Sequence, residues 1–235
     1  MTWSIVARDA SGAFGIAIAS RFFAVGALCP YIRSGVGAVS TQALVSPMYG
    51  PQVLDLLAGG QGPRDAIAQV TAEDAGRDHR QLHAVAADGT SFAHTGAACI
   101  DWCGHLAGDG FSVAGNMLAG PQVLQATADA YRANLHRDFA ERLVEALAAG
   151  EAAGGDKRGK QGAALLIHTT EDYPALDIRV DDHEEPVREL RRLYMKSLER
   201  FVPFSAFLPT RAQPAGTTDR AIIEAGIERF HATRR

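Results

Sequence analysis

The sequence predicts an α+β fold in which two antiparallel sheets are covered by pairs of helices. Stretches with the two-residue period of strands arrive in blocks, whereas single strands alternating with helices would favour a doubly wound sheet. Stretches with the 3.6-residue period of helices follow these blocks in pairs. Apolar residues make up 47% of the 235 residues, which fits one compact domain with an ordinary core.

The first block of strands is a hairpin. Residues 3–7 alternate with the period of a strand, 9–12 form a turn, and 14–20 are a second, mostly apolar strand. The run Gly-Val-Gly-Ala-Val at 35–39 predicts a third, buried strand.

Two helices are expected next, followed by a second hairpin. The first helix carries apolar residues at 53, 54 and 57 and stops at the Gly59-Gly60 pair. Pro63 suits the first turn of the second helix, which continues to Val70. The two-residue period then returns on both sides of Asp88-Gly89, a strong signal for a two-residue hairpin turn.

The second half of the chain repeats this order and ends in a weakly patterned tail. The elements expected there are a strand up to 115, helices at 121–135 and 139–147, strands at 163–167 and 177–180, and a helix at 187–198. The tail beyond Phe201 is expected to be ordered by docking or by a partner. We therefore expect a domain at 1–200 and a C-terminal extension at 201–235.

Charge and composition exclude several classes of partner. A net charge of -4 with a pI near 6.1 gives no electrostatic reason to expect nucleic acid or an anionic membrane as partner. No apolar stretch is long enough to span a bilayer, and the chain opens without a signal peptide's pattern. With three cysteines, an odd count, a reducing, cytoplasmic location is expected.

The start of the chain carries the first candidate for chemistry. Initiator methionine is usually removed before a small residue, and removal of Met1 would leave Thr2 with both a hydroxyl and a free amine. Such an amine titrates near pH 7.7–8.0 when unperturbed, so it can accept the hydroxyl proton. Thr2 also stands at the head of a strand. The alternative interpretation is an ordinary first strand residue.

Several segments resemble the opening of proteasome-type N-terminal-nucleophile hydrolases, namely 2–7, the hairpin through 19–21, and 35–43. More specifically, the chain resembles a bacterial family known as the domain of unknown function 1028, which is placed in that superfamily. The stretches that carry this likeness are 22–27, 40–43, 95–99, 115–118, 154–159 and 180–183. The resemblance covers about residues 2–200. It implies a four-layer αββα sandwich and a homo-oligomer, and it leaves the reaction open.

One departure from the superfamily pattern bears on the mechanism. Proteasome-type enzymes place an aspartate after the start of the second strand and a lysine before the next strand, whereas this chain has Ala19-Ser20-Arg21 and Ile32-Arg33. Arg33 can replace the lysine as a fixed positive charge but not as a proton shuttle. This favours simpler amide hydrolysis over proteasome-like peptidase chemistry.

Three further segments supply candidate site residues. In the loop 154–161, Lys157 or Arg158 would clamp a carboxylate and Asp156 would bind or orient an amine, unless the loop is merely solvated. Asn116 would donate its amide to an oxyanion, or would bond within a local turn. Thr41 and Gln42 would line a substrate pocket opposite Thr2, or would cap the following helix.

Zinc binding by Cys99, Cys103 and His105 is the less favoured interpretation, because their spacing fits no standard zinc framework. We expect no metal and no cofactor. The function hypothesis is hydrolysis of a small-molecule amide or peptide-like bond by Thr2, with Asn116 and Arg33 assisting. The alternative is a non-catalytic binding or assembly protein of the same fold.

Overall fold

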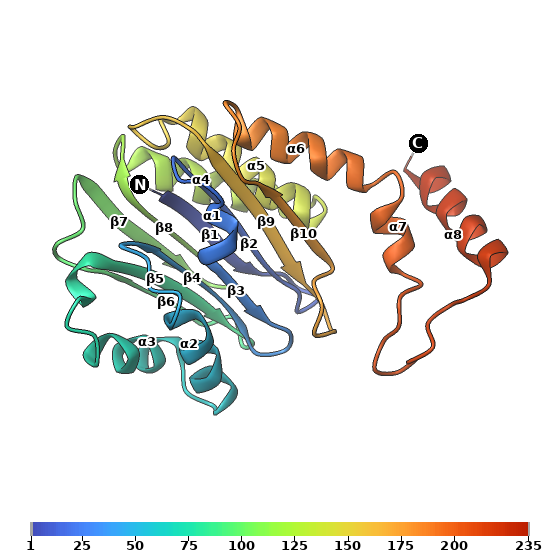
Figure 1. Ribbon diagram of the computed structural model, residues 1–235, viewed down its shortest axis with the longest axis horizontal. Helices are drawn as coiled ribbons and strands as arrows, with labels where there is room; N and C mark the ends of the chain where they lie inside the picture. The colour runs from blue at the N-terminus through green and yellow to red at the C-terminus, as the bar shows by residue number, and fades with distance from the viewer. Residues whose placement is uncertain (1, 235) are drawn as a thin grey trace.

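The computed structural model describes residues 2–234, whose strands form two antiparallel sheets (Figure 1). The larger sheet has the order β10-β9-β2-β1-β8-β7, and the smaller has the order β3-β4-β5-β6. The strands of the larger sheet are β1 (Thr2–Arg8), β2 (Phe14–Ser20), β7 (Trp102–Gly108), β8 (Phe111–Leu118), β9 (Gly162–His168) and β10 (Leu176–Val180). Those of the smaller sheet are β3 (Pro30–Arg33), β4 (Gly37–Ala43), β5 (Arg80–Ala86) and β6 (Ser91–Thr95).

Helices cover the outer faces of both sheets (Figure 1). On the larger sheet lie α4 (Gln122–Ala133), α5 (Phe139–Ala152) and α6 (Pro186–Ser197), which share an apolar core with Trp3 and Ile5 of β1. On the smaller sheet lie α2 (Tyr49–Ala58) and α3 (Pro63–Ala72), packed around Val39 and Leu82. The prediction of two antiparallel sheets with attached helices is confirmed.

The space between the sheets changes from apolar to polar along β1. Successive side chains of a strand point to opposite faces, so Trp3 and Ile5 meet the helices while Thr2, Ser4 and Val6 face the other sheet. Around Val6 the inter-sheet layer is apolar. Around Ser4 it consists of hydrogen-bonded polar side chains. The polar end is therefore the one where β1 begins.

Two of the strands, one short helix and the two helices of the tail beyond residue 200 are absent from the sequence prediction. β3 has only four residues, all half-buried, so it shows no clear alternation of apolar and polar residues. It begins with a proline, which is tolerated because β3 is an edge strand. The edge strand β7 contains Cys103 and His105, two of the three candidate zinc ligands. The four-residue helix α1 (Val25–Leu28) is too short to show a period. The predicted third strand exists as β4, with its end at Ala43.

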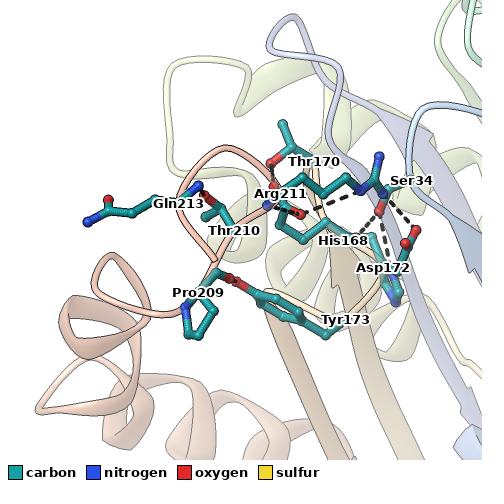
Figure 2. A network of polar contacts seen from close by, with 10 residues as sticks. Ser34, His168, Thr170, Asp172, Tyr173, Pro209, Thr210, Arg211 and Gln213 are labelled. Atoms are coloured by element: carbon teal, nitrogen blue, oxygen red, sulfur yellow. Dashed lines mark hydrogen bonds and ion pairs between the residues drawn. The ribbon is translucent and has the colours of Figure 1, made fainter. Parts of the chain in front are cut away.

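The C-terminal extension forms α7 (Phe201–Ser205) and α8 (Arg220–Thr233), which lie beyond the end of α6 (Figure 1). The loop between β9 and β10 holds the connecting segment (Figure 2): Arg211 pairs with Asp172 at 2.7 Å, and the Tyr173 hydroxyl donates to the Pro209 carbonyl at 2.7 Å. Within residues 2–234, no helix combines the length and the apolar character needed to cross a bilayer.

Candidate active site

A cavity of about 350 Å³ opens at the polar end of the inter-sheet layer. Its size lies within the range of about 300–1,000 Å³ typical of small-molecule sites. The wall is built from the ends of β1, β2, β4 and β8, from the α1 region, and from the loops after β6 and α5. The lining residues are Thr2, Ser20, Phe22, Val25, Cys29, Gln42, Ala43, Leu44, Val45, His79, Ala98, Cys99, Ile100, Asn116, Met117 and Arg158.

Thr2 occupies the inner wall of this cavity. It is the first residue of β1, a central strand, and it lies in register with Ser20 on β2 and Asn116 on β8. Its Oγ1 is 3.0 Å from Ser20 Oγ, and the residue is buried except for the cavity. The predicted removal of Met1 concerns a residue outside the described range.

Gln81 on β5 fixes the orientation of the side-chain amides around Thr2. Its Nε2 lies 2.9 Å from the Gly115 carbonyl and 3.1 Å from the Gly104 carbonyl. Carbonyl oxygens only accept hydrogen bonds, so this end of the side chain must be the nitrogen. Oε1 then accepts from Gln42 Nε2 at 2.8 Å and from Asn116 Nδ2 at 3.0 Å. Two backbone carbonyls thus determine which end of the Gln81, Gln42 and Asn116 side chains is the nitrogen and which is the oxygen.

The donor-to-acceptor order that Gln81 sets also fixes the hydrogen bonds of Ser4 and His83. Because Nε2 of Gln42 faces Gln81, Oε1 of Gln42 accepts the Ser4 hydroxyl at 2.7 Å. Ser4 has one proton to give, so His83 Nε2, 2.8 Å away, must be the donor in that contact. Burial lowers the pKa of His83 to about 3. The ring is therefore a neutral Nε2–H tautomer at physiological pH.

Asp156 anchors the glycine-rich loop between α5 and β9 to the cavity wall. Its Oδ2 accepts the Arg21 N–H at 2.8 Å and Arg158 Nη2 at 3.3 Å, while Oδ1 accepts the Arg158 N–H at 2.8 Å. Gly154 and Gly155 have φ of 121° and 49°, a backbone region that strongly favours glycine. The loop is therefore shaped to present Arg158 at the cavity.

The structure brings some of the predicted site residues together and leaves others apart. Thr2, Gln42, Asn116 and Arg158 line one cavity, with Asp156 directly behind Arg158. The other three predicted residues do not belong to that lining. Arg33 pairs with Asp55 at 2.7 Å, Thr41 points to the opposite face of β4 from Gln42, and Lys157 pairs with Asp101 at 2.8 Å.

The sequence prediction missed Ser20 and most of the apolar lining. The structure pairs Arg8 with Phe14 and therefore Thr2 with Ser20, whereas the predicted turn at 9–12 would pair Thr2 with Ala19, so the sequence prediction gave no signal for this contact. The segment 22–27 carries part of the family likeness, but its sequence gives no sign that Phe22 and Val25 line a pocket. Cys29 and Cys99 also line the cavity, and burial raises the pKa of both, to about 12 for Cys29. Both are therefore neutral thiols at physiological pH.

Left-handed backbone conformation gathers around the cavity. Within residues 2–234, the non-glycine residues with positive φ are Ala24, Ala43, Asp101 and Met117, at 51–70°. Ala43 and Met117 line the cavity, and the other two directly adjoin lining residues. Such conformations are costly for non-glycine residues and cluster at functional sites. Their placement makes this end of the molecule the candidate functional end.

No metal site is apparent within the described part of the chain, where no three His, Cys, Asp or Glu side chains gather as ligands would. Cys103 Sγ instead contacts the Cys99 carbonyl at 3.6 Å, and His105 Nδ1 contacts Thr95 Oγ1 at 2.9 Å. Nothing in these contacts favours the zinc interpretation.

Fold and site together define a mixed α/β protein with two antiparallel sheets and a small-molecule-sized cavity at one end. The profile described as "Family of unknown function (DUF1028)" matches residues 2–190, and the chain belongs to this family. A crystal structure of a DUF1028 protein from Silicibacter pomeroyi is 32% identical and has a TM-score of 0.87. The match covers 93% of this chain and 96% of that one.

A second structural match is far more distant. Anbu, described as an ancestral beta-subunit, from Yersinia bercovieri is 11% identical with a TM-score of 0.38, over 83% of this chain and 94% of that chain. A search of curated proteins gives no match.

Proposed function

We propose that this protein hydrolyses a small amide or peptide-like bond, with Thr2 as the N-terminal nucleophile after removal of Met1. The observation that carries the proposal is the position of Thr2: its hydroxyl stands in the wall of the cavity, at the start of a central strand, beside buried polar side chains. In this proposal the facing sheets and their helices form the four-layer αββα sandwich of N-terminal-nucleophile hydrolases. Residues 1–200 are the catalytic domain, and 201–235 are an extension.

The reaction uses one residue as both nucleophile and base. The freed amine of Thr2 accepts the proton of Oγ1, which attacks the amide carbon and forms the Oγ1–C bond. The C–N bond then breaks, and the amine product leaves with the proton. Water cleaves the resulting ester, which releases the acid and restores Thr2. Ser20 Oγ, 3.0 Å from Oγ1, orients the hydroxyl before attack.

Asn116 stabilises the oxyanion in this mechanism. One hydrogen of its Nδ2 is used by Gln81 Oε1 at 3.0 Å, which holds the side-chain amide in place at the cavity wall. The second hydrogen is the donor for the developing charge, and removal of one such donor typically costs about 10²–10³ in kcat. Arg158, held by Asp156, binds an anionic group of the substrate.

The alternative is a non-catalytic binding or assembly role for the same fold. It is favoured by the position of Arg33, which pairs with Asp55 and does not belong to the cavity lining, so it cannot replace the missing lysine there. Our mechanism needs no lysine, because the Thr2 amine supplies the base.

The test compares hydrolysis of a panel of small amides by the wild type and by Thr2→Val and Thr2→Ser. Valine keeps the shape of threonine without the hydroxyl, so Thr2→Val should lose turnover while folding is retained. Thr2→Ser keeps the hydroxyl and should keep measurable turnover. Full activity of Thr2→Val would overturn the proposal.

A further inference from the structure

The cavity wall beside Thr2 is largely apolar. Phe22, Leu44 and Ile100 line it although 48%, 61% and 60% of their surfaces are exposed. Large apolar side chains gathered at one exposed concave site usually mark a binding surface. Val25 and Val45 continue the wall inward, where they join a buried apolar cluster. This side of the cavity comes from α1, the end of β4 and the loop after β6.

The charge of the lining has one sign. Arg158 contributes a guanidinium, and within residues 2–234 no aspartate or glutamate belongs to the lining. Asp156, behind Arg158, has its side chain 2% exposed and serves three N–H donors, so it orients the guanidinium without facing the cavity. A carboxylate is the ligand group that a fixed guanidinium matches best, whereas an ammonium group would find no counter-charge in this wall.

Thr2, Arg158 and the apolar side chains line the same cavity. Arg158 comes from the loop beside the ends of β2 and β8, next to the segment of Phe22, and Leu44 and Val45 follow the end of β4 in the other sheet. A bound amide with its carbonyl at Thr2 therefore has both an apolar wall and a guanidinium available to its two substituents within one cavity.

We propose that the substrates are N-acyl amino acids with a medium-length apolar acyl chain: the acyl chain occupies the wall of Phe22, Leu44 and Ile100, and the amino-acid carboxylate binds Arg158. This inference rests on the proposed function. In the reaction the acyl group passes to Thr2 Oγ1 and then to water, and the free amino acid leaves.

Binding, measured without turnover, tests the substrate class. Thr2→Val is titrated by calorimetry with N-hexanoylglycine, with N-acetylglycine, and with N-hexanoylglycinamide, which lacks the carboxylate. Each added buried methylene is worth about fourfold in affinity, so the hexanoyl compound should bind at least tenfold more tightly than the acetyl compound. Loss of the carboxylate should cost at least tenfold.

Two pairs of variants, made in the Thr2→Val background, assign these preferences to residues. Phe22→Ala should reduce the hexanoyl preference severalfold, whereas Phe23→Ala should not, because Phe23 is the next residue and is also exposed but lies outside the lining. Arg158→Gln should remove most of the preference for the free carboxylate. Lys196→Gln removes the same charge at an exposed position on α6, away from the cavity, and should leave that preference intact.

The outcomes separate this inference from the proposed function. Tight, carboxylate-dependent binding of N-hexanoylglycine by a protein that hydrolyses neither it nor any amide of the panel would overturn the hydrolase and leave only a binding site for this class of ligand. Hydrolysis of other amides with no binding of N-hexanoylglycine would overturn the substrate class and leave the hydrolase standing. Equal affinities for all three compounds would also overturn the substrate class. This comparison uses Thr2→Val alone, so it does not depend on whether the second-site variants fold.

Discussion

Gln81 connects the backbone of the larger sheet to the residues around Thr2. Its amide joins two carbonyls to the side chains of Gln42 and Asn116, and Gln42 Nε2 is also 3.5 Å from the Thr2 carbonyl. The side chains of Gln42, Gln81 and Asn116 are buried, so each depends on a protein partner rather than on water. Gln81 therefore acts as a positioning residue for the proposed oxyanion donor.

Replacing Gln81 by leucine should destabilise the protein by about 3 kcal/mol or more, because it leaves several buried polar groups unpaired at about 1–3 kcal/mol each. Urea denaturation measures the change. Gln125→Leu is the control, since Gln125 bonds to Asp129 on the exposed face of α4, and its effect should stay within about 0.5 kcal/mol. Equal stabilities of the two variants would contradict the account of this network.

Much of the candidate site could be predicted from the sequence, because Thr2, Asn116, Gln42 and Arg158 meet as expected at one cavity. The prediction was less specific for Thr41 and Gln42. Adjacent strand residues point to opposite faces, so only one of the two can face the cavity, and the sequence alone does not say which face of the strand meets the other sheet. The apolar lining was missed because it comes from short loops and a four-residue helix, which carry no periodic pattern.

At the scale of elements, the loop between α5 and β9 depends on one carboxylate. Asp156→Ala should free the backbone N–H groups of Arg21 and Arg158, and their hydrogen exchange should become at least about tenfold faster. Asp129→Ala, on the exposed face of α4 and away from this loop, is the matched control and should leave both amides protected. Unchanged exchange in Asp156→Ala would show that the loop is held by other contacts.

The arrangement of elements was more predictable than their number. Long segments with a clear period, such as 14–20 and 139–147, appear as β2 and α5. The edge strands β3 and β7 were not predicted, because they are only partly buried and so need no regular alternation of apolar and polar residues.

At the scale of the whole molecule, stability should fall as the pH decreases from about 6.5 toward 3. Burial lowers the pKa of His83 to about 3, so the unfolded chain binds a proton in this range that the folded protein excludes. One such group changes the free energy of unfolding by at most about 1.4 kcal/mol per pH unit. The lowered pKa values of His105 and His168, also caused first by burial, act in the same direction.

His83→Gln should weaken this pH dependence, since glutamine offers Ser4 an amide hydrogen and does not titrate. Urea denaturation at pH 7, 5 and 4 compares the slopes, whatever the stability of the variant at pH 7. Identical slopes for wild type and variant would show that His83 is not the group responsible.

The extension 201–235 should be separable from the rest of the chain. The main core comes from residues up to Leu198 with Val202 at its margin, and the tail is held largely by surface contacts such as Arg200 with Glu224 and Arg211 with Asp172. Surface pairs of this kind contribute about 0–1 kcal/mol each. A chain ending at residue 200 should fold and melt within several degrees of the full chain. Loss of cooperative melting would instead place the extension inside the folding unit.

The central claim, that Thr2 is an N-terminal nucleophile, is tested most directly by intact-mass spectrometry of the purified protein. The account predicts a chain that lacks Met1, with the Thr2 amine free to act as base. A chain that retains Met1 would contradict it, because an amine held in a peptide bond cannot accept the hydroxyl proton.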